Sequence, residues 1–133
     1  MSYQLDTDIC IDALRGRIPR VLARMQACDP SEIHLSAVTC AELQFGALRS
    51  DHPAESVAVL NEFVGTFAVV PFDQAAAKCS AEIRAHLEQR GTPIGPNDLL
   101  IAATALANDL TLVTRNHREF SRVVGLRIED WST

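Results

Sequence analysis

The chain has 133 residues, of which 47% are hydrophobic and 22% charged, and its formal net charge is −5. This length and composition fit a globular protein that forms one domain with a real core. The net negative charge argues against a protein that holds nucleic acid through bulk positive charge alone, but it allows a nucleic-acid site that works through a bound cation.

The cysteines and the N-terminus indicate a cytoplasmic protein. None of the four cysteines forms a C-x-x-C pair, so we expect buried, reduced thiols and no structural zinc site. The first residues lack a basic region followed by an apolar run, so no signal peptide is expected. No apolar stretch is long enough to span a membrane.

Short apolar runs alternate with longer helical patterns, which predicts an α/β fold of parallel strands joined by helical crossovers. The expected strands are residues 3–5, 33–36, 68–72, 111–114 and 126–128. The expected helices are residues 8–15, 18–28, one that begins after Thr39, 53–67, 73–90, 95–109 and 116–123. Gly16 and Gly91 should end helices, and Pro19 and Pro96 should lie in first turns. Helix 95–109 is apolar on nearly every side, so it should lie in the core.

Four acids recur at corresponding ends of these strand–helix units. Asp6 ends the first strand, whereas Glu42, Asp98 and Glu119 each open a following helix. In an open parallel sheet, sites form where the carboxyl ends of the strands meet the next helices. We therefore expect these carboxylates to converge.

Each acid also has a capping interpretation, and taken singly the two interpretations are about equally good. Asp8 is a natural N-cap, and Asp98 in a first turn complements the helix dipole. The remaining candidates are a bond from Asp6 to a neighbouring backbone N–H and capping boxes of the form Thr39-x-x-Glu42 and Asn116-x-x-Glu119. The recurrence of the acids favours a shared site.

Converging carboxylates repel one another unless a cation lies between them. An oxygen-only ligand set favours Mg²⁺, with Mn²⁺ as a substitute. The chemistry that this predicts is hydrolysis of a phosphodiester by metal-activated water, without a serine, cysteine or lysine nucleophile.

Four motifs carry a resemblance to a known family: "LDTDIC", "TCAELQFGA", "IGPNDLLIAATA" and "LVTRNHREFSRVVGLRIEDW". In this order and spacing they resemble a VapC-type toxin, a ribonuclease with a PIN domain, over essentially the whole chain. The resemblance implies a single PIN domain over residues 1–133, folded as a three-layer α/β/α sandwich around a mostly parallel sheet. It also implies a Mg²⁺-dependent endoribonuclease that cleaves RNA, with tRNA and especially initiator tRNA as candidates. The implied partners are a VapB-type antitoxin, in a toxin–antitoxin hetero-oligomer, and a second copy of the chain in a homodimer.

The resemblance assigns roles to particular residues. Asp6, Glu42 and Asp98 would be the catalytic, metal-binding acids, and Glu119 a fourth catalytic acid that takes over from the aspartate many PIN domains carry at the place of Asn116. The supporting residues are Thr114 and Asn116, which would hold Asp6 or a metal-bound water, and Asp8, as an N-cap or outer-shell group.

The arginines are candidates for RNA contact. Arg115 and Arg118 neighbour the expected metal site, which favours phosphate binding. For Arg17, Arg20 and Arg24, RNA contact and a solvated helix face are equally good interpretations. Helix 53–67 is apolar over a wide arc, so any excess beyond the sheet would make a partner surface.

Two other functions are weighed against the nuclease. A PIN domain that binds RNA or protein without cutting is the stronger alternative, although such domains typically lose the acids that this chain keeps. The segment "DTD" also resembles the start of haloacid-dehalogenase-type phosphatases. That class needs a downstream lysine, and the only lysine here is Lys78, inside an expected helix.

Overall fold

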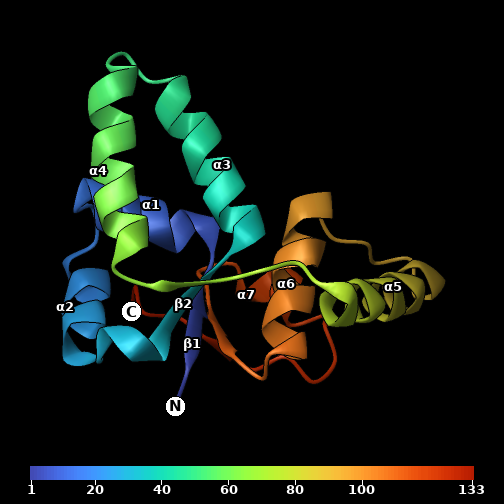
Figure 1. The fold of residues 1–133 in the computed structure, drawn as a ribbon. Helices are drawn as coiled ribbons and strands as arrows, with labels where there is room; N and C mark the ends of the chain where they lie inside the picture. Colours follow the sequence, from blue (N-terminus) through green and yellow to red (C-terminus); the bar gives the residue numbers. More distant parts are fainter.

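The computed structural model describes residues 1–133 and shows a central sheet with helices on both faces (Figure 1). The strands are β1 (Tyr3–Leu5), β2 (Ile33–Ser36), β3 (Ala68–Val70), β4 (Thr111–Val113) and β5 (Ile128–Glu129). Their order is β3-β2-β1-β4-β5, and every neighbouring pair is parallel. The predicted α/β/α sandwich is confirmed, and β1 is its central strand.

The helices are α1 (Thr7–Arg15), α2 (Pro19–Ala27), α3 (Ala37–Leu48), α4 (Pro53–Gly65), α5 (Gln74–Gln89), α6 (Pro96–Ala107) and α7 (His117–Phe120), with a 3-10 turn at Pro30–Glu32. All expected strands and helices are present. The strands β3 and β4 are shorter than predicted, β5 lies later than predicted, and α7 is half the expected length. The predicted ends after α1 and α5 are confirmed, since Gly16 and Gly91 adopt positive φ angles of 61° and 68°.

The starts of α1 and α3 correct two capping predictions. Asp6, not Asp8, is the N-cap of α1, and its carboxylate accepts a 2.9 Å hydrogen bond from the Ile9 amide. Ser36, not Thr39, is the N-cap of α3, because the Ser36 hydroxyl accepts from the Thr39 amide at 3.0 Å. Glu42 therefore lies inside α3 rather than in a capping box. Both true caps are the last polar side chains before the helix, directly at the strand ends.

The two faces of the sheet bury separate cores. One core includes Leu5, Ile33 and Leu35 of the strands and packs against α1–α4, with Trp131 fully buried in it. The other is built on α5 and α6 and includes Leu112 of β4. Figure 1 shows α5 and α6 on the right, apart from α1, α2 and α4 on the left. Residues 101–105 of α6 are all buried, which confirms that this helix lies in the core.

Gln4 ties the central strand to α6. Its side chain is fully buried, and Nε2 donates a 3.0 Å hydrogen bond to the backbone carbonyl of Ile101. This contact packs the middle of α6 against the central strand. No helix in the structure has the length and apolar character of a membrane span.

Candidate active site

Acidic side chains gather where β1, β2 and β4 end. Asp6 follows β1 directly, and Glu42 lies in the second turn of α3, which follows β2. Glu119 lies in α7, after β4, and Asp98 lies in the first turn of α6. The charges of Glu119, Asp6 and Glu42 all raise the pKa of Asp98, so the four acids face one region at this edge of the sheet.

Asp6 is the most buried of these acids, with 5% of its surface exposed. Burial raises its pKa to about 6, although hydrogen bonding to the Thr114 hydroxyl and the Ile9 amide favours the ionised form. The backbone amide of Asp6 also donates to the Val113 carbonyl at 3.0 Å, which continues the β1–β4 pairing to the site. The Asp6 carboxylate is thus fixed by its own helix start and by the neighbouring strand.

Asp98 and Glu119 interact with each other directly. Burial raises the pKa of Asp98 to about 7, and the negative charge of Glu119 and a hydrogen bond to it push in the same direction. For Glu119, burial alone raises the pKa, but hydrogen bonds from the Gly95 amide, Asn116 and Asp98 outweigh it and leave the pKa below its usual value. A proton taken up by this pair therefore binds to Asp98 rather than to Glu119.

The position of Glu119 depends on two donors. Its Oε1 accepts from the Gly95 amide at 2.8 Å, and its Oε2 accepts from Asn116 Nδ2 at 2.7 Å. A Cβ atom at Gly95 would lie 3.5 Å from Asp98 Oδ2 and 3.7 Å from Glu119 Oε1. Both are ordinary van der Waals distances, so Gly95 contributes to the site through its amide, which lies beside the two carboxylates.

Glu42 is held from the other side of the site. Its Oε1 accepts from the Thr7 hydroxyl at 2.6 Å, and its Oε2 accepts from Asn97 Nδ2 at 3.2 Å. These contacts tie α3 to the starts of α1 and α6. They also occupy both Glu42 oxygens, and no three acidic, histidine or cysteine side chains are grouped closely enough to hold a metal ion in this conformation.

The supporting residues divide into three cases. Thr114 interacts with Asp6, one of the two roles considered for it, and its hydroxyl also accepts from the Asn116 amide at 2.9 Å. Asn116 orients Glu119 instead of Asp6, and it makes no side-chain cap for α7. Asp8 is exposed on α1, and its side chain makes no hydrogen bond within the chain.

The two candidate RNA-binding arginines differ in their surroundings. Arg118 is exposed, and its guanidinium makes no contact with an acid. Arg115 forms an ion pair with Asp12 of α1, in which Nε lies 2.8 Å from Oδ2. Sequence reasoning missed Asp12. The available signal was an acid three residues after Ile9, on the face of α1 that is buried.

Among the other arginines, Arg24 makes contacts that stabilise the fold. It pairs with Glu129 at 3.0 Å and lies over the ring of Trp131. Arg17 and Arg20 are exposed. Lys78 is exposed on α5, a helix that contributes none of the four acids, which argues against the phosphatase alternative.

The chain is similar to known proteins over nearly its whole length. A family model described as PIN domain matches residues 3–126. The chain is 41% identical to the tRNA(fMet)-specific endonuclease VapC of Shigella flexneri over 99% of both chains, and 36% identical to ribonuclease VapC2 of Haemophilus influenzae over 98% of both. The crystal structure of DNA-bound VapBC from Salmonella typhimurium contains a chain that is 37% identical, with a TM-score of 0.93 and 98% of each chain covered.

The parallel sheet, the acidic edge and the family match together define a PIN-domain protein, and the chain belongs to that family. Its end-to-end similarity to ribonucleases of the VapC type places it, more narrowly, among the VapC toxins.

The coupled acids predict an unusual pH dependence of stability for the metal-free protein. Asp98 has a pKa of about 7 in the folded state against 3.8 as its ordinary value, so between these pH values the folded state binds more protons than the unfolded state. The contribution of Asp98 to the free energy of unfolding therefore falls as the pH rises. We expect Asp98→Asn to melt a few degrees above the wild type at pH 8 in EDTA, with the difference shrinking at pH 5.

Asp51→Asn is the matched control, because Asp51 is exposed in the turn between α3 and α4. It should melt with the wild type at both pH values. An Asp98→Asn variant whose melting difference from the wild type is the same at pH 5 and pH 8 would contradict the coupling.

Proposed function

We propose that this protein is a Mg²⁺-dependent endoribonuclease that cleaves tRNA, with initiator tRNA as the first candidate. The observation that carries the proposal is the convergence of Asp6, Glu42, Asp98 and Glu119 on one sheet edge, close enough to hold the pKa of Asp98 near 7. A site that concentrates negative charge in this way is adapted to bind a cation. The tRNA candidate is supported by the 41% identical relative from Shigella flexneri, which is named as a tRNA(fMet)-specific endonuclease.

The donor set fits a divalent ion of the Mg²⁺ or Mn²⁺ type. All the donors are carboxylate oxygens, and a nearby cation would favour the ionised form of Asp98 over the protonated one. Asp6, Asp98 and Glu42 would hold the ion, which requires the three side chains to draw together from their positions in this structure. When bound, the ion would activate water for attack on a phosphodiester and stabilise the charge on the leaving oxygen.

The protein's own residues prepare this arrangement. Ile9 and Thr114 fix Asp6, while Gly95 and Asn116 fix Glu119. Glu119, whose pKa is lowered, is a carboxylate able to orient a water molecule beside Asp98. Because these contacts come from α1, α6 and α7, the site is assembled by the whole carboxyl edge of the sheet and not by one loop.

RNA would approach this edge from the side of α7. Arg118 supplies an exposed cation two residues after Asn116, where it can contact a phosphate of the substrate. A nuclease that cleaves tRNA would act where tRNA is found, so we propose that the protein works in the cytoplasm. The four retained acids also favour a cutting enzyme over the silent RNA- or protein-binding alternative.

We further propose a VapB-type antitoxin partner and a homodimer within the complex. Solved relatives are VapBC complexes, including those from Salmonella typhimurium and Rickettsia felis. This chain has a groove between α1, α3 and α4 whose lining includes Ile11, Leu14 and Val59, and Val59 is 57% exposed. The predicted apolar excess on helix 53–67 thus has a counterpart in the structure. A partner that covers this surface would remove apolar area from water.

We also infer that residues 1–133 form a single PIN domain. All helices pack on one five-stranded sheet, and the family match spans residues 3–126.

Cleavage is tested with purified protein and initiator tRNA. We expect Mg²⁺-dependent fragments from the wild type and from Asp51→Asn, and a loss of at least about 100-fold in rate for Asp98→Asn, because one metal-holding carboxylate is removed. Sequencing the 5′ ends of the fragments would locate the cut.

Equal RNA decay with wild type and Asp98→Asn would reject the nuclease. Binding of tRNA without decay in either protein would instead support the silent PIN-domain alternative. Cleavage of elongator tRNAs at the same rate would remove the preference for initiator tRNA.

The antitoxin proposal is tested in a bacterial host. Induction of the wild-type chain should arrest growth, and co-expression of the small gene adjacent to its own should restore growth. Asp98→Asn should not arrest growth. If the adjacent gene fails to relieve arrest by the wild type, the assignment of that gene as antitoxin is wrong even where the nuclease assay succeeds.

A further inference from the structure

The shortest ion pair in the structure joins α1 to the segment after β4. Arg115 Nε donates to Asp12 Oδ2 at 2.8 Å, and Arg115 Nη2 donates to Asp12 Oδ1 at 3.4 Å. The two residues are 103 positions apart in the chain. This bidentate, side-on geometry fixes the plane of the guanidinium as well as its position.

The two partners differ sharply in exposure. The Asp12 side chain is 3% exposed, whereas that of Arg115 is 44% exposed. A guanidinium carries five N–H donors. Asp12 accepts from two of them, and Nη1 makes no hydrogen bond within the chain. Asp12 thus holds the guanidinium from the buried side, and the exposed side of Arg115 keeps donors that no other residue uses.

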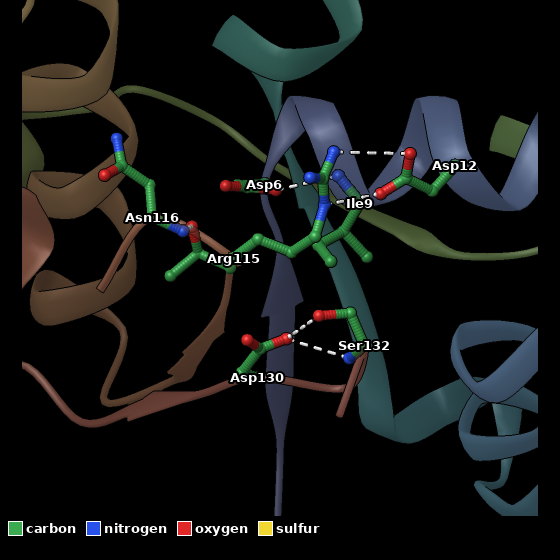
Figure 2. Close-up of polar contacts among 8 residues, drawn as sticks. Asp6, Ile9, Asp12, Arg115, Asn116, Asp130 and Ser132 are labelled. Carbon is green, nitrogen blue, oxygen red and sulfur yellow. Dashed lines mark hydrogen bonds and ion pairs between the residues drawn. The ribbon is translucent and has the colours of Figure 1, made fainter. Parts of the chain in front are cut away.

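The guanidinium lies next to the proposed catalytic edge. Figure 2 shows it beside the first turn of α1, with Asp12 on one side and Asp6 on the other. The charge of Arg115 also lowers the pKa of Asp6 and of Asp130 slightly, although Asp12 is the only acid that it contacts. Asp130 itself is turned toward Ser132, whose amide donates to Oδ1 at 2.8 Å (Figure 2).

We propose that Asp12 is a positioning residue that holds Arg115 as a fixed anchor for one phosphate of the RNA, next to the scissile bond. The inference rests on the proposed nuclease function. A free arginine in this position would sample many rotamers, and it would lose that freedom whenever RNA bound. The ion pair removes that cost before the substrate arrives, and the planar fork matches the geometry of a phosphate.

An argument from net charge alone and the proposed positioning role predict opposite effects of neutralising Asp12. Asp12 is an anion close to a polyanionic substrate, so its neutralisation should strengthen RNA binding if only net charge matters. If Asp12 acts by holding Arg115, its neutralisation should slow cleavage although the protein has become more positive. The two accounts therefore differ in the sign of the effect.

The test compares Asp12→Asn, Arg115→Lys, Arg115→Gln and the double variant Asp12→Asn/Arg115→Gln. Steady-state cleavage of initiator tRNA is measured with Mg²⁺, and tRNA affinity is measured with Ca²⁺ in place of Mg²⁺ at several salt concentrations. Glu88→Gln is the matched control, since Glu88 and Arg84 form an exposed ion pair on α5, 3.0 Å apart. Thermal melting with and without Mn²⁺ shows whether each variant is folded and still binds the ion.

We expect kcat/KM to fall about tenfold in both Asp12→Asn and Arg115→Lys, with the Mn²⁺-induced melting shift retained. Arg115→Gln should also reduce the slope of log Kd against log salt by about 0.7 to 0.9, the contribution of one phosphate contact. The double variant should be no worse than Arg115→Gln alone, because Asp12 acts only through Arg115. Glu88→Gln should match the wild type.

Cleavage and tRNA affinity in Asp12→Asn that equal or exceed those of the wild type would overturn the proposal and leave the pair as a structural link between α1 and β4. This result differs from failure of the nuclease function, in which the wild type itself would not cut. If the wild type does not cut, tRNA affinity measured with Ca²⁺ still tests the anchor. The proposal requires weaker tRNA binding in both Asp12→Asn and Arg115→Gln.

Discussion

Mutual repulsion among carboxylates at one edge of a parallel sheet is the constraint on which this structure depends. The sheet order places β1 between β2 and β4, so the acids that follow these strands cannot avoid one another. The repulsion is visible in Asp98, whose pKa is raised to about 7 by burial and by the charges of Glu119, Asp6 and Glu42. Such an arrangement costs stability in the absence of a cation, and it persists because neutral donors hold most of the carboxylates in place.

Those donors explain why residues with no charge of their own matter to the site. Thr7 and Asn97 hold Glu42, and the Gly95 amide and Asn116 hold Glu119. Each donor belongs to a different helix start or connecting segment from the acid that it holds, apart from Asn116. The geometry of the site therefore depends on how α1, α3, α6 and α7 pack together. A change in the packing of any one of these helices would move the carboxylates.

The order of strands and helices along the chain could be predicted from the sequence, as could the acids that follow the strand ends. Alternating apolar runs predicted the parallel sheet, and Asp98 stood out because it opens a helix that is otherwise apolar. The N-cap positions were harder to predict from the sequence, because Asp6 and Ser36 could each end a strand or cap a helix. Only the three-dimensional path of the chain shows which role each residue has. The capping-box pattern at Glu42 was misleading for the same reason, since its side chain bonds to the distant residues Thr7 and Asn97. Glu119 does bond to Asn116, but through the amide side chain and not as a capping box, and its second oxygen accepts from the distant Gly95 amide.

The Asp12–Arg115 pair could not be predicted from local patterns, because its partners are 103 residues apart and Asp12 lies outside the recognised motifs. A buried acid on an apolar helix face signals that a partner exists, but it does not say which cation supplies the charge. Arg115 was correctly noticed for its place near the acids, but the contact that fixes it is set by the proximity of α1 to the end of β4. Long-range ion pairs of this kind depend on tertiary structure and need coordinates.

The central claim is that the four acids form a site for a divalent ion. The most direct measurement is the anomalous difference map of crystals grown with Mn²⁺, collected near the manganese absorption edge. The account predicts one strong peak bounded by the carboxylates of Asp6 and Asp98, with Glu42 turned toward it, and no such peak in crystals of Asp98→Asn. A fully occupied Mn²⁺ at some other place on the surface, with Asp6 and Asp98 left unliganded, would contradict it.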